Sequence, residues 1–147
     1  MTIAIASGHG GYKLKNEIIS YFDKNKISYK DLGCFSEEPV DYPDIAIKCA
    51  EAVARGEFEK GIIICGTGIG VSITANKVKG IRAALCHDTF SARMSREHNN
   101  ANVLTMGGRV IGPGLAIDIV KEWLAAEFAG DRHQRRVEKI MEYENSK

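Results

Sequence analysis

The chain has 147 residues, a length typical of one domain that buries about two-thirds of its unfolded surface. Its 20 Lys and Arg residues nearly balance its 19 Asp and Glu residues, so it lacks the basic surplus of a nucleic-acid-binding domain. No segment approaches the roughly 18 consecutive apolar residues of a membrane-spanning helix, and the N-terminus lacks the pattern of a signal peptide. We therefore expect one cytoplasmic domain over residues 1–147, with no nucleic-acid or membrane partner.

Short apolar runs alternate with segments of helical periodicity along the whole chain. The segment 12–24, for example, places Leu14, Ile18 and Phe22 on one face of a helix. In chain order we expect a strand at 3–6, a helix at 12–24, a strand at 28–31, a helix at 42–55, a strand at 61–65, a helix at 70–78, a strand at 81–86, a helix at 89–98, a strand at 103–106, and helices at 113–128 and 132–143.

Five strands that alternate with helices predict a three-layer α/β fold, in which a parallel sheet is covered by helices on both faces. In such folds ligands bind at the carboxyl edge of the sheet. Three glycine-rich turns, at 7–11, 65–70 and 107–109, follow predicted strands and should meet at that edge. We expect the functional site where these turns converge.

The turn at 65–70, Cys-Gly-Thr-Gly-Ile-Gly, is the most informative segment. A strand that enters a helix through glycines directs bare backbone N–H groups toward one point, and the helix N-terminus adds partial positive charge suited to an anion. The same field favours the thiolate form of Cys65. This turn therefore predicts a catalytic cysteine.

Other motifs are excluded by spacing. The four cysteines contain no C-x-x-C pair, which argues against zinc and redox chemistry, and we expect Cys49 and Cys86 to be packing residues. Cys34 has no predicted role. The turn at 65–70 also fails as a nucleotide site, because no lysine follows Gly70 as in a Walker A loop, and Val71 stands where a dinucleotide fingerprint needs glycine.

Two polar segments remain. The run 98–102, His-Asn-Asn-Ala-Asn, ends a predicted helix, and a helix C-cap explains one of its asparagines but not three beside a histidine. Arg132 and Arg136 are four residues apart and share a face of the last helix. They are either a solvated pair or two guanidiniums suited to a phosphate dianion.

Together these segments resemble the type B ribose-5-phosphate isomerases, in the group that includes the galactose-6-phosphate isomerase subunits. The resemblance covers essentially the whole chain. It implies a five-stranded flavodoxin-like (Rossmann-like) sheet, and a homodimer or homotetramer whose active site is completed across the subunit interface. It also implies no metal or organic cofactor, since no electrons leave the substrate. The segments that carry the resemblance are 41–43, 64–70, 75–77, 80–82, 95–99 and 130–136.

The resemblance also implies a role for each site residue in aldose–ketose isomerisation of ribose 5-phosphate to ribulose 5-phosphate. Cys65 would be the base that takes the C2 proton to form an enediolate, Thr67 would shuttle protons between sugar oxygens, and His98 would open the furanose ring. The implied substrate contacts are the backbone N–H groups of Gly66, Gly68, Ile69 and Gly70 to the oxyanion, His9, Arg109, Arg132 and Arg136 to the phosphate, and Tyr42 and Asn99 to hydroxyls.

One position departs from the family pattern. The family usually carries Ser-Asp-His in the first turn, whereas this chain has Ser7, Gly8 and His9. The missing carboxylate would contact a sugar hydroxyl or assist ring opening, so Gly8 leaves the preferred substrate open. The alternatives are an isomerase of galactose 6-phosphate, allose 6-phosphate or a tetrose phosphate, and a non-catalytic phosphosugar sensor. Retention of Cys65, Thr67 and His98 argues against the sensor, which would need no base.

Overall fold

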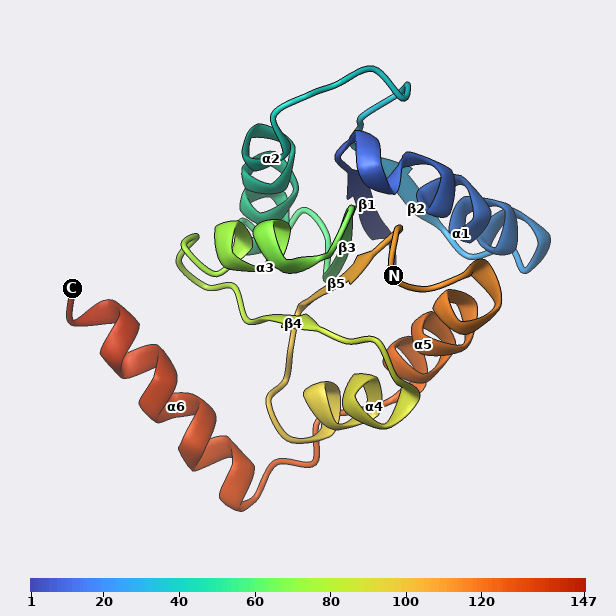
Figure 1. Cartoon of the computed structure of the whole chain (residues 1–147). Helices are drawn as coiled ribbons and strands as arrows, with labels where there is room; N and C mark the ends of the chain where they lie inside the picture. Colours follow the sequence, from blue (N-terminus) through green and yellow to red (C-terminus); the bar gives the residue numbers. More distant parts are fainter.

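The structure is a computed structural model that describes all of residues 1–147. One sheet of five parallel strands is covered by helices on both faces, as expected (Figure 1). In chain order the elements are β1 (Ile3–Ser7), the 3₁₀ helix η1 (His9–Gly11), α1 (Tyr12–Lys24), β2 (Tyr29–Asp31), α2 (Tyr42–Ala54), β3 (Lys60–Cys65), α3 (Ile69–Ala75), β4 (Ala83–Leu85), α4 (Thr89–Glu97), β5 (Val103–Gly107), α5 (Pro113–Ala125) and α6 (Arg132–Asn145).

The strands lie in the order β2-β1-β3-β5-β4, so β2 and β4 form the two edges of the sheet. From β1 the chain moves outward to β2, at one edge of the sheet. From β3 it moves in the opposite direction, to β4 at the other edge and then back to β5. The boundary between β1 and β3 is therefore the topological switch point, where α/β folds bind ligands at the carboxyl ends of the strands. The turns after β1 and β3 are the two that open onto this crevice.

Alternate side chains of the central strands pack on opposite faces of the sheet, as a strand period of two requires. Ile62 and Ile64 of β3 join the core beneath α1, α4 and α5. Ile63 and Cys65 of the same strand join the core beneath α2 and α3. This alternation places Cys65 on the face of the sheet that α2 and α3 cover, and at the carboxyl end of its strand.

Backbone hydrogen bonds join the three glycine-rich turns at the carboxyl edge. The N–H of Gly8, after β1, donates to the Ile64 carbonyl at 2.9 Å, and the N–H of Gly108, after β5, donates to the Cys65 carbonyl at 2.8 Å. The Arg109 N–H donates to the Gly66 carbonyl at 3.0 Å. The prediction that these turns share one edge is therefore confirmed.

The elements α3 and β4 are among those that end or begin short of the predicted ranges. α3 ends at Ala75 because the backbone tightens there, and the N–H groups of Lys77 and Val78 bond to carbonyls three residues back. β4 contains only three residues, since the Arg82 N–H donates to the side chain of Asn102 at 2.8 Å rather than to a neighbouring strand.

The last helix, α6, projects from the rest of the molecule (Figure 1). Only His133 and Val137 of its 14 residues are buried. The large side chains of Ile140 and Tyr143 are 50% and 66% exposed. Neither α6 nor any other helix is both long enough and apolar enough to cross a bilayer.

Candidate active site

A cavity of about 250 Å³ opens at the carboxyl edge, between the turns that follow β1 and β3. The loop that enters α2 and the turn after β5 complete its wall, so four segments far apart in the sequence meet here. All of its lining residues except Gly10 are among the predicted site residues. The lining consists of His9, Gly10, Tyr42, Cys65, Gly66, Thr67, Gly70 and Arg109.

Cys65 is the last residue of β3, and its side chain is 7% exposed. Its Sγ accepts a hydrogen bond from the Gly68 N–H at 3.1 Å. Gly68 has a left-handed conformation, with φ 78°, and a Cβ there would lie 2.7 Å from the backbone of Met106. Glycine is therefore needed for the chain to turn its N–H onto the sulfur, where the bond stabilises negative charge.

The other cysteines differ from Cys65. Cys49 is fully buried, and burial raises its pKa to about 12. Cys86 is 2% exposed, and burial raises its pKa to about 11. Both are thus packing residues, as predicted, and neither lines the cavity. Cys65 is the cysteine whose sulfur could meet a bound substrate.

The local contacts of Thr67 and Ile69 differ from the expected oxyanion site. The hydroxyl of Thr67 accepts a hydrogen bond from the Ile69 N–H at 3.2 Å. The N–H groups of Gly68 and Ile69 are therefore engaged by the side chains of Cys65 and Thr67, and in this conformation they do not point to a common anion. The cause is the tightness of the turn, which brings each side chain within reach of a nearby amide.

Tyr42, the first residue of α2, packs its ring against Gly70 of the turn that follows β3. A Cβ on Gly70 would lie 2.4 Å from the Tyr42 ring, so the close approach of ring and turn requires glycine. Tyr42 is 39% exposed. Its phenol therefore stands between the cavity and solvent, where it can donate to a ligand hydroxyl.

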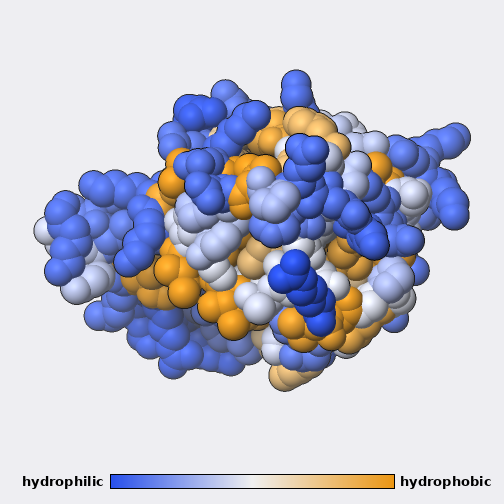
Figure 2. All heavy atoms as spheres, turned by 45° about the horizontal axis from the view of Figure 1, so that its top comes forward, coloured by the Kyte–Doolittle hydropathy of each residue, from blue (hydrophilic) through white to orange (hydrophobic).

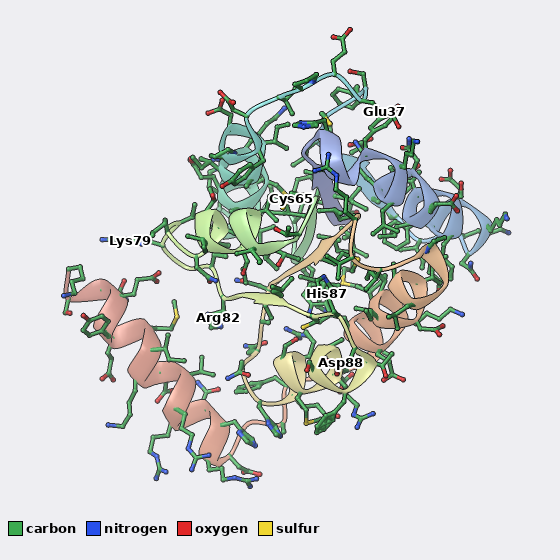
Figure 3. All side chains as sticks on the ribbon, in the orientation of Figure 1. Glu37, Cys65, Lys79, Arg82, His87 and Asp88 are labelled. Carbon is green, nitrogen blue, oxygen red and sulfur yellow. The ribbon has the colours of Figure 1, made fainter.

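A second cavity, of about 360 Å³, adjoins the first and shares His9, Gly10 and Arg109 with it. Lys13 and Glu37 line this second cavity and form an exposed ion pair at 3.5 Å. Figure 3 shows Glu37 on the loop between β2 and α2, on the same side of the molecule as the end of β3 that carries Cys65. With Lys13, His9 and Arg109 nearby, the combined cavity suits an anion such as phosphate.

Sequence reasoning missed Lys13 and Glu37, and it also missed His87. The His87 Nε2 accepts a hydrogen bond from the Gly107 N–H at 2.9 Å and so supports the turn that carries Arg109 (Figure 3). The signal for His87 was its place directly after a predicted strand. Lys13 offered a similar signal just after the first turn, whereas Glu37 lies in a loop without any periodic pattern.

Four predicted site residues lie elsewhere: His98, Asn99, Arg132 and Arg136 line neither cavity. In a parallel α/β sheet, a helix that starts at the carboxyl edge ends at the amino edge. α4 and α5 both end there, and the Ala129 N–H bonds to the Glu97 carbonyl at 2.9 Å, which ties the start of α6 to the same edge. These residues therefore lie at the opposite edge from Cys65 of their own chain.

His98 is stacked on His133, with ring centroids 4.1 Å apart and an interplanar angle of 12°. His133 is 8% exposed. Burial lowers the pKa of His133, and the neighbouring His98, Arg132 and Arg136 lower it further. The junction of α4 and α6 thus brings together two stacked imidazole rings and two guanidinium groups, and none of the four forms an ion pair with a carboxylate.

A parallel sheet with a thiol and cationic side chains at its carboxyl edge is typical of an α/β enzyme that acts on a small anionic substrate. The sequence profile described as Ribose/Galactose Isomerase matches residues 3–140. The chain therefore belongs to the ribose/galactose isomerase family.

Known relatives are similar over nearly their full length. Ribose-5-phosphate isomerase B of Escherichia coli is 49% identical, over 94% of this chain and 93% of its own. The D-erythrulose-4-phosphate isomerase of Pectobacterium atrosepticum is 46% identical, over 99% and 96%. The solved structure of Clostridium thermocellum ribose-5-phosphate isomerase B has 56% identity and a TM-score of 0.97, over 99% of both chains.

A further solved structure, ribose-5-phosphate isomerase B of Mycoplasma genitalium, contains bound ribulose 5-phosphate. It has 42% identity and a TM-score of 0.94, over 99% of this chain and 97% of its own. These findings identify the chain as an aldose–ketose isomerase that acts on sugar phosphates. The alternative of a non-catalytic phosphosugar sensor is therefore set aside.

Proposed function

We propose that the protein interconverts ribose 5-phosphate and ribulose 5-phosphate through an enediolate, with Cys65 as the base. The observation that supports this most strongly is the sulfur of Cys65 in a cavity that His9, Thr67 and Arg109 also line. The relatives named as ribose-5-phosphate isomerases support the choice of a five-carbon substrate.

In the proposed reaction, the Cys65 thiolate removes the C2 proton of the open-chain aldose. The electron pair forms the C1–C2 double bond, and the carbonyl oxygen becomes an enolate at O1. Thr67 then passes the O2 proton to O1, and the Cys65 thiol returns its proton to C1. A C2 carbonyl forms, the thiolate is regenerated, and no electrons leave the substrate.

We further propose that a second copy of the chain supplies His98, Asn99, Arg132 and Arg136. Opposite edges of one sheet cannot meet, so these four residues can reach a Cys65 cavity only on another molecule. The His98 imidazole would open the sugar ring by moving a proton between ring oxygen and hydroxyl, and the two guanidiniums would hold the phosphate with His9 and Arg109.

The surface of the chain supports such a homodimer, or a homotetramer built from two of them. Apolar patches interrupt the hydrophilic surface in Figure 2. Ile69 and Ile73 of α3 are 52% and 59% exposed, and Leu85, on the edge strand β4, is 39% exposed. Together with the projecting α6, these side chains leave an apolar area of the kind that subunit interfaces cover.

The test is replacement of Cys65 by alanine. We expect turnover of ribose 5-phosphate to fall by about 10³-fold or more, as typical for loss of a catalytic base or nucleophile, while calorimetry still detects substrate binding. Cys86→Ala is the matched control, because it removes a thiol that lies outside the cavity. A Cys65→Ala enzyme with a rate within about tenfold of the parent would contradict the cysteine base.

A second candidate is isomerisation of another aldose phosphate. Gly8 favours it, because a Cβ there would lie 3.1 Å from the Tyr42 Cβ and 3.9 Å from the Cys65 Cβ, so glycine leaves space beside the reacting sulfur. Comparison of kcat/KM for ribose 5-phosphate, allose 6-phosphate, galactose 6-phosphate and a tetrose phosphate decides between the candidates. We expect ribose 5-phosphate to have the highest kcat/KM. A higher kcat/KM for another sugar phosphate would make that compound the substrate instead.

A further inference from the structure

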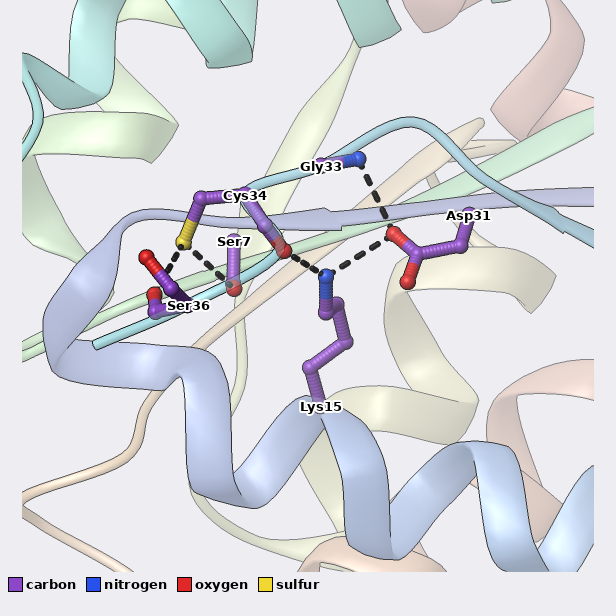
Figure 4. Close-up of polar contacts among 6 residues, drawn as sticks. All are labelled: Ser7, Lys15, Asp31, Gly33, Cys34 and Ser36. Atoms are coloured by element: carbon purple, nitrogen blue, oxygen red, sulfur yellow. Dashed lines mark hydrogen bonds and ion pairs between the residues drawn. The ribbon is translucent and has the colours of Figure 1, made fainter. Parts of the chain in front are cut away.

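The loop between β2 and α2 contains no helix or strand, yet its first part is tied to the end of β1. The Ser7 N–H donates to the Gly33 carbonyl at 2.6 Å, and the Cys34 N–H donates to the Ser7 carbonyl at 2.7 Å. The Cys34 Sγ also lies 3.3 Å from the Ser36 carbonyl and 3.8 Å from the Ser7 hydroxyl (Figure 4). The first part of the loop therefore has a defined position.

Lys15 of α1 lies beneath this loop, and its side chain is fully buried. Its Nζ donates to Asp31 Oδ1 at 2.8 Å and also to the Cys34 carbonyl (Figure 4). The same Asp31 oxygen accepts the Gly33 N–H at 2.9 Å. The Nζ is also 5.3 Å from the centroid of the Phe35 ring.

A buried ammonium is costly unless its charge and its N–H groups find partners. Here the partners of Lys15 are the carboxylate that ends β2 and a carbonyl of the loop itself. Lys15 therefore fixes the loop at its start, and its removal would leave the Cys34 carbonyl without its side-chain donor and Asp31 without its ion-pair partner.

The far end of the loop contacts the active site. The Val40 N–H donates to the Nδ1 of His9 at 3.2 Å. An N–H can donate only to an unprotonated ring nitrogen, so a neutral His9 in this arrangement carries its proton on Nε2. His9 lines both cavities, and Nε2–H is then its one ring donor for a bound oxyanion.

We propose that Lys15 is a positioning residue: through the loop 33–40 it fixes the orientation and the tautomer of His9, and so sets the affinity for the phosphate group. Lys15 lines neither cavity and does not touch the substrate. The kinetic part of this inference rests on the proposed function, in which His9 contacts the phosphate. The tautomer of His9 does not depend on that function.

The kinetic test compares the parent enzyme with Lys15→Met, which keeps the length of the side chain and removes its charge. We expect KM for ribose 5-phosphate and the inhibition constant of inorganic phosphate to rise about tenfold, with kcat within about threefold of the parent. Lys24→Met is the control, because Lys24 is an exposed lysine at the end of the same helix. Unchanged constants in a folded Lys15→Met enzyme would overturn the proposal.

The double variant with His9→Ala separates positioning from a general loss of structure. If Lys15 acts through His9, Lys15→Met raises KM no further in the His9→Ala background. A full additional tenfold increase there would show that Lys15 acts by another route. Where Lys15→Met alone does not fold, Lys15→Met with Asp31→Leu removes the buried ammonium together with its partly exposed carboxylate partner and is used in the same comparison.

Long-range ¹H–¹⁵N NMR of the imidazole groups reads the tautomer directly. At a pH where His9 is neutral, the parent should show the Nε2–H form, and Lys15→Met should show a mixture of the two forms. A shift of tautomer in an enzyme that does not turn over ribose 5-phosphate would retain the inference and reject the proposed substrate. A His9 that keeps the Nε2–H form in Lys15→Met would overturn the inference.

Discussion

Tyr42 and Gly70 show at the scale of single residues how space, rather than chemistry, selects an amino acid. A Cβ on residue 70 would lie only 2.4 Å from the phenol ring, which is too close for both groups to keep these positions. The ring is the movable end of a half-exposed side chain, so a methyl group at position 70 would displace it rather than unfold the protein.

We therefore expect Gly70→Ala to raise KM about tenfold through loss of the Tyr42 contact, and to change the free energy of unfolding by no more than about 1 kcal/mol. The control is Gly114→Ala in α5, where a Cβ meets no atom within 4 Å. Steady-state kinetics and urea unfolding measure both effects. Equal KM values for the two variants would show that Tyr42 does not contact the substrate.

Gly8 offers a second prediction at this scale. Its φ of −76° is accessible to any residue, and its neighbours at 3.1 Å and 3.9 Å are the side chains of Tyr42 and Cys65. Gly8→Asp should therefore fold and place a carboxylate beside the thiol. If ribose 5-phosphate is the natural substrate, kcat/KM for it should rise. A fall, together with a preserved rate on another aldose phosphate, would indicate a site shaped for that sugar.

At the scale of elements, the junction of α4 and α6 is sensitive to pH. Burial lowers the pKa of His133 in the folded protein, and the neighbouring His98, Arg132 and Arg136 lower it further. The unfolded chain then binds the proton more readily than the folded chain does. The contribution of His133 to stability is complete above the ordinary histidine pKa of about 6.5, and it is lost as the pH falls through that value toward the lowered one.

We therefore expect the midpoint of thermal unfolding to fall more steeply between about pH 7 and pH 5 in the parent than in His133→Phe. Phenylalanine keeps a flat ring against His98 but cannot be protonated. The difference between the two proteins, measured by calorimetry across this range, isolates His133 from the carboxylates that titrate in both. Parallel curves would assign the pH dependence to other groups.

The sequence predicts the order and type of the elements because each strand and helix has its own periodicity. Their ends depend on contacts that no local pattern contains. The helix predicted to reach residue 128 ends at Ala125, where the next residue turns to an extended conformation with ψ 142° and no glycine marks the change. The strand predicted at 81–86 begins only at Ala83, since the side chain of Asn102 replaces a strand partner.

In the site, too, residues within a local sequence pattern could be predicted, and residues placed by long-range contacts could not. The turn after β3 could be predicted, because its glycines and its cysteine are consecutive in the sequence. Glu37 could not, since its loop carries no motif or periodic pattern, and His87 and Lys13 offered only their places after a predicted strand and after the first turn. The loop that carries Glu37 is held by the buried Lys15, and no sequence pattern indicates such a contact.

At the scale of the whole molecule, the fold separates two groups of predicted site residues. Cys65 lies at the carboxyl edge of the sheet, and His98 and the arginine pair lie at the amino edge. A symmetric dimer resolves this separation, because a two-fold axis can bring the amino edge of each copy to the carboxyl edge of the other. In the dimer that we propose, there would be two sites, and each would combine residues from both chains.

Complementation between two inactive variants tests this account most directly. Cys65→Ala and His98→Asn are each expected to be inactive as homodimers. In a mixed dimer one site carries both changes and the other carries neither, so equal co-expression should restore about a quarter of the parental activity. A mixture that contains mixed dimers and remains as inactive as its components would contradict a catalytic site shared between two chains.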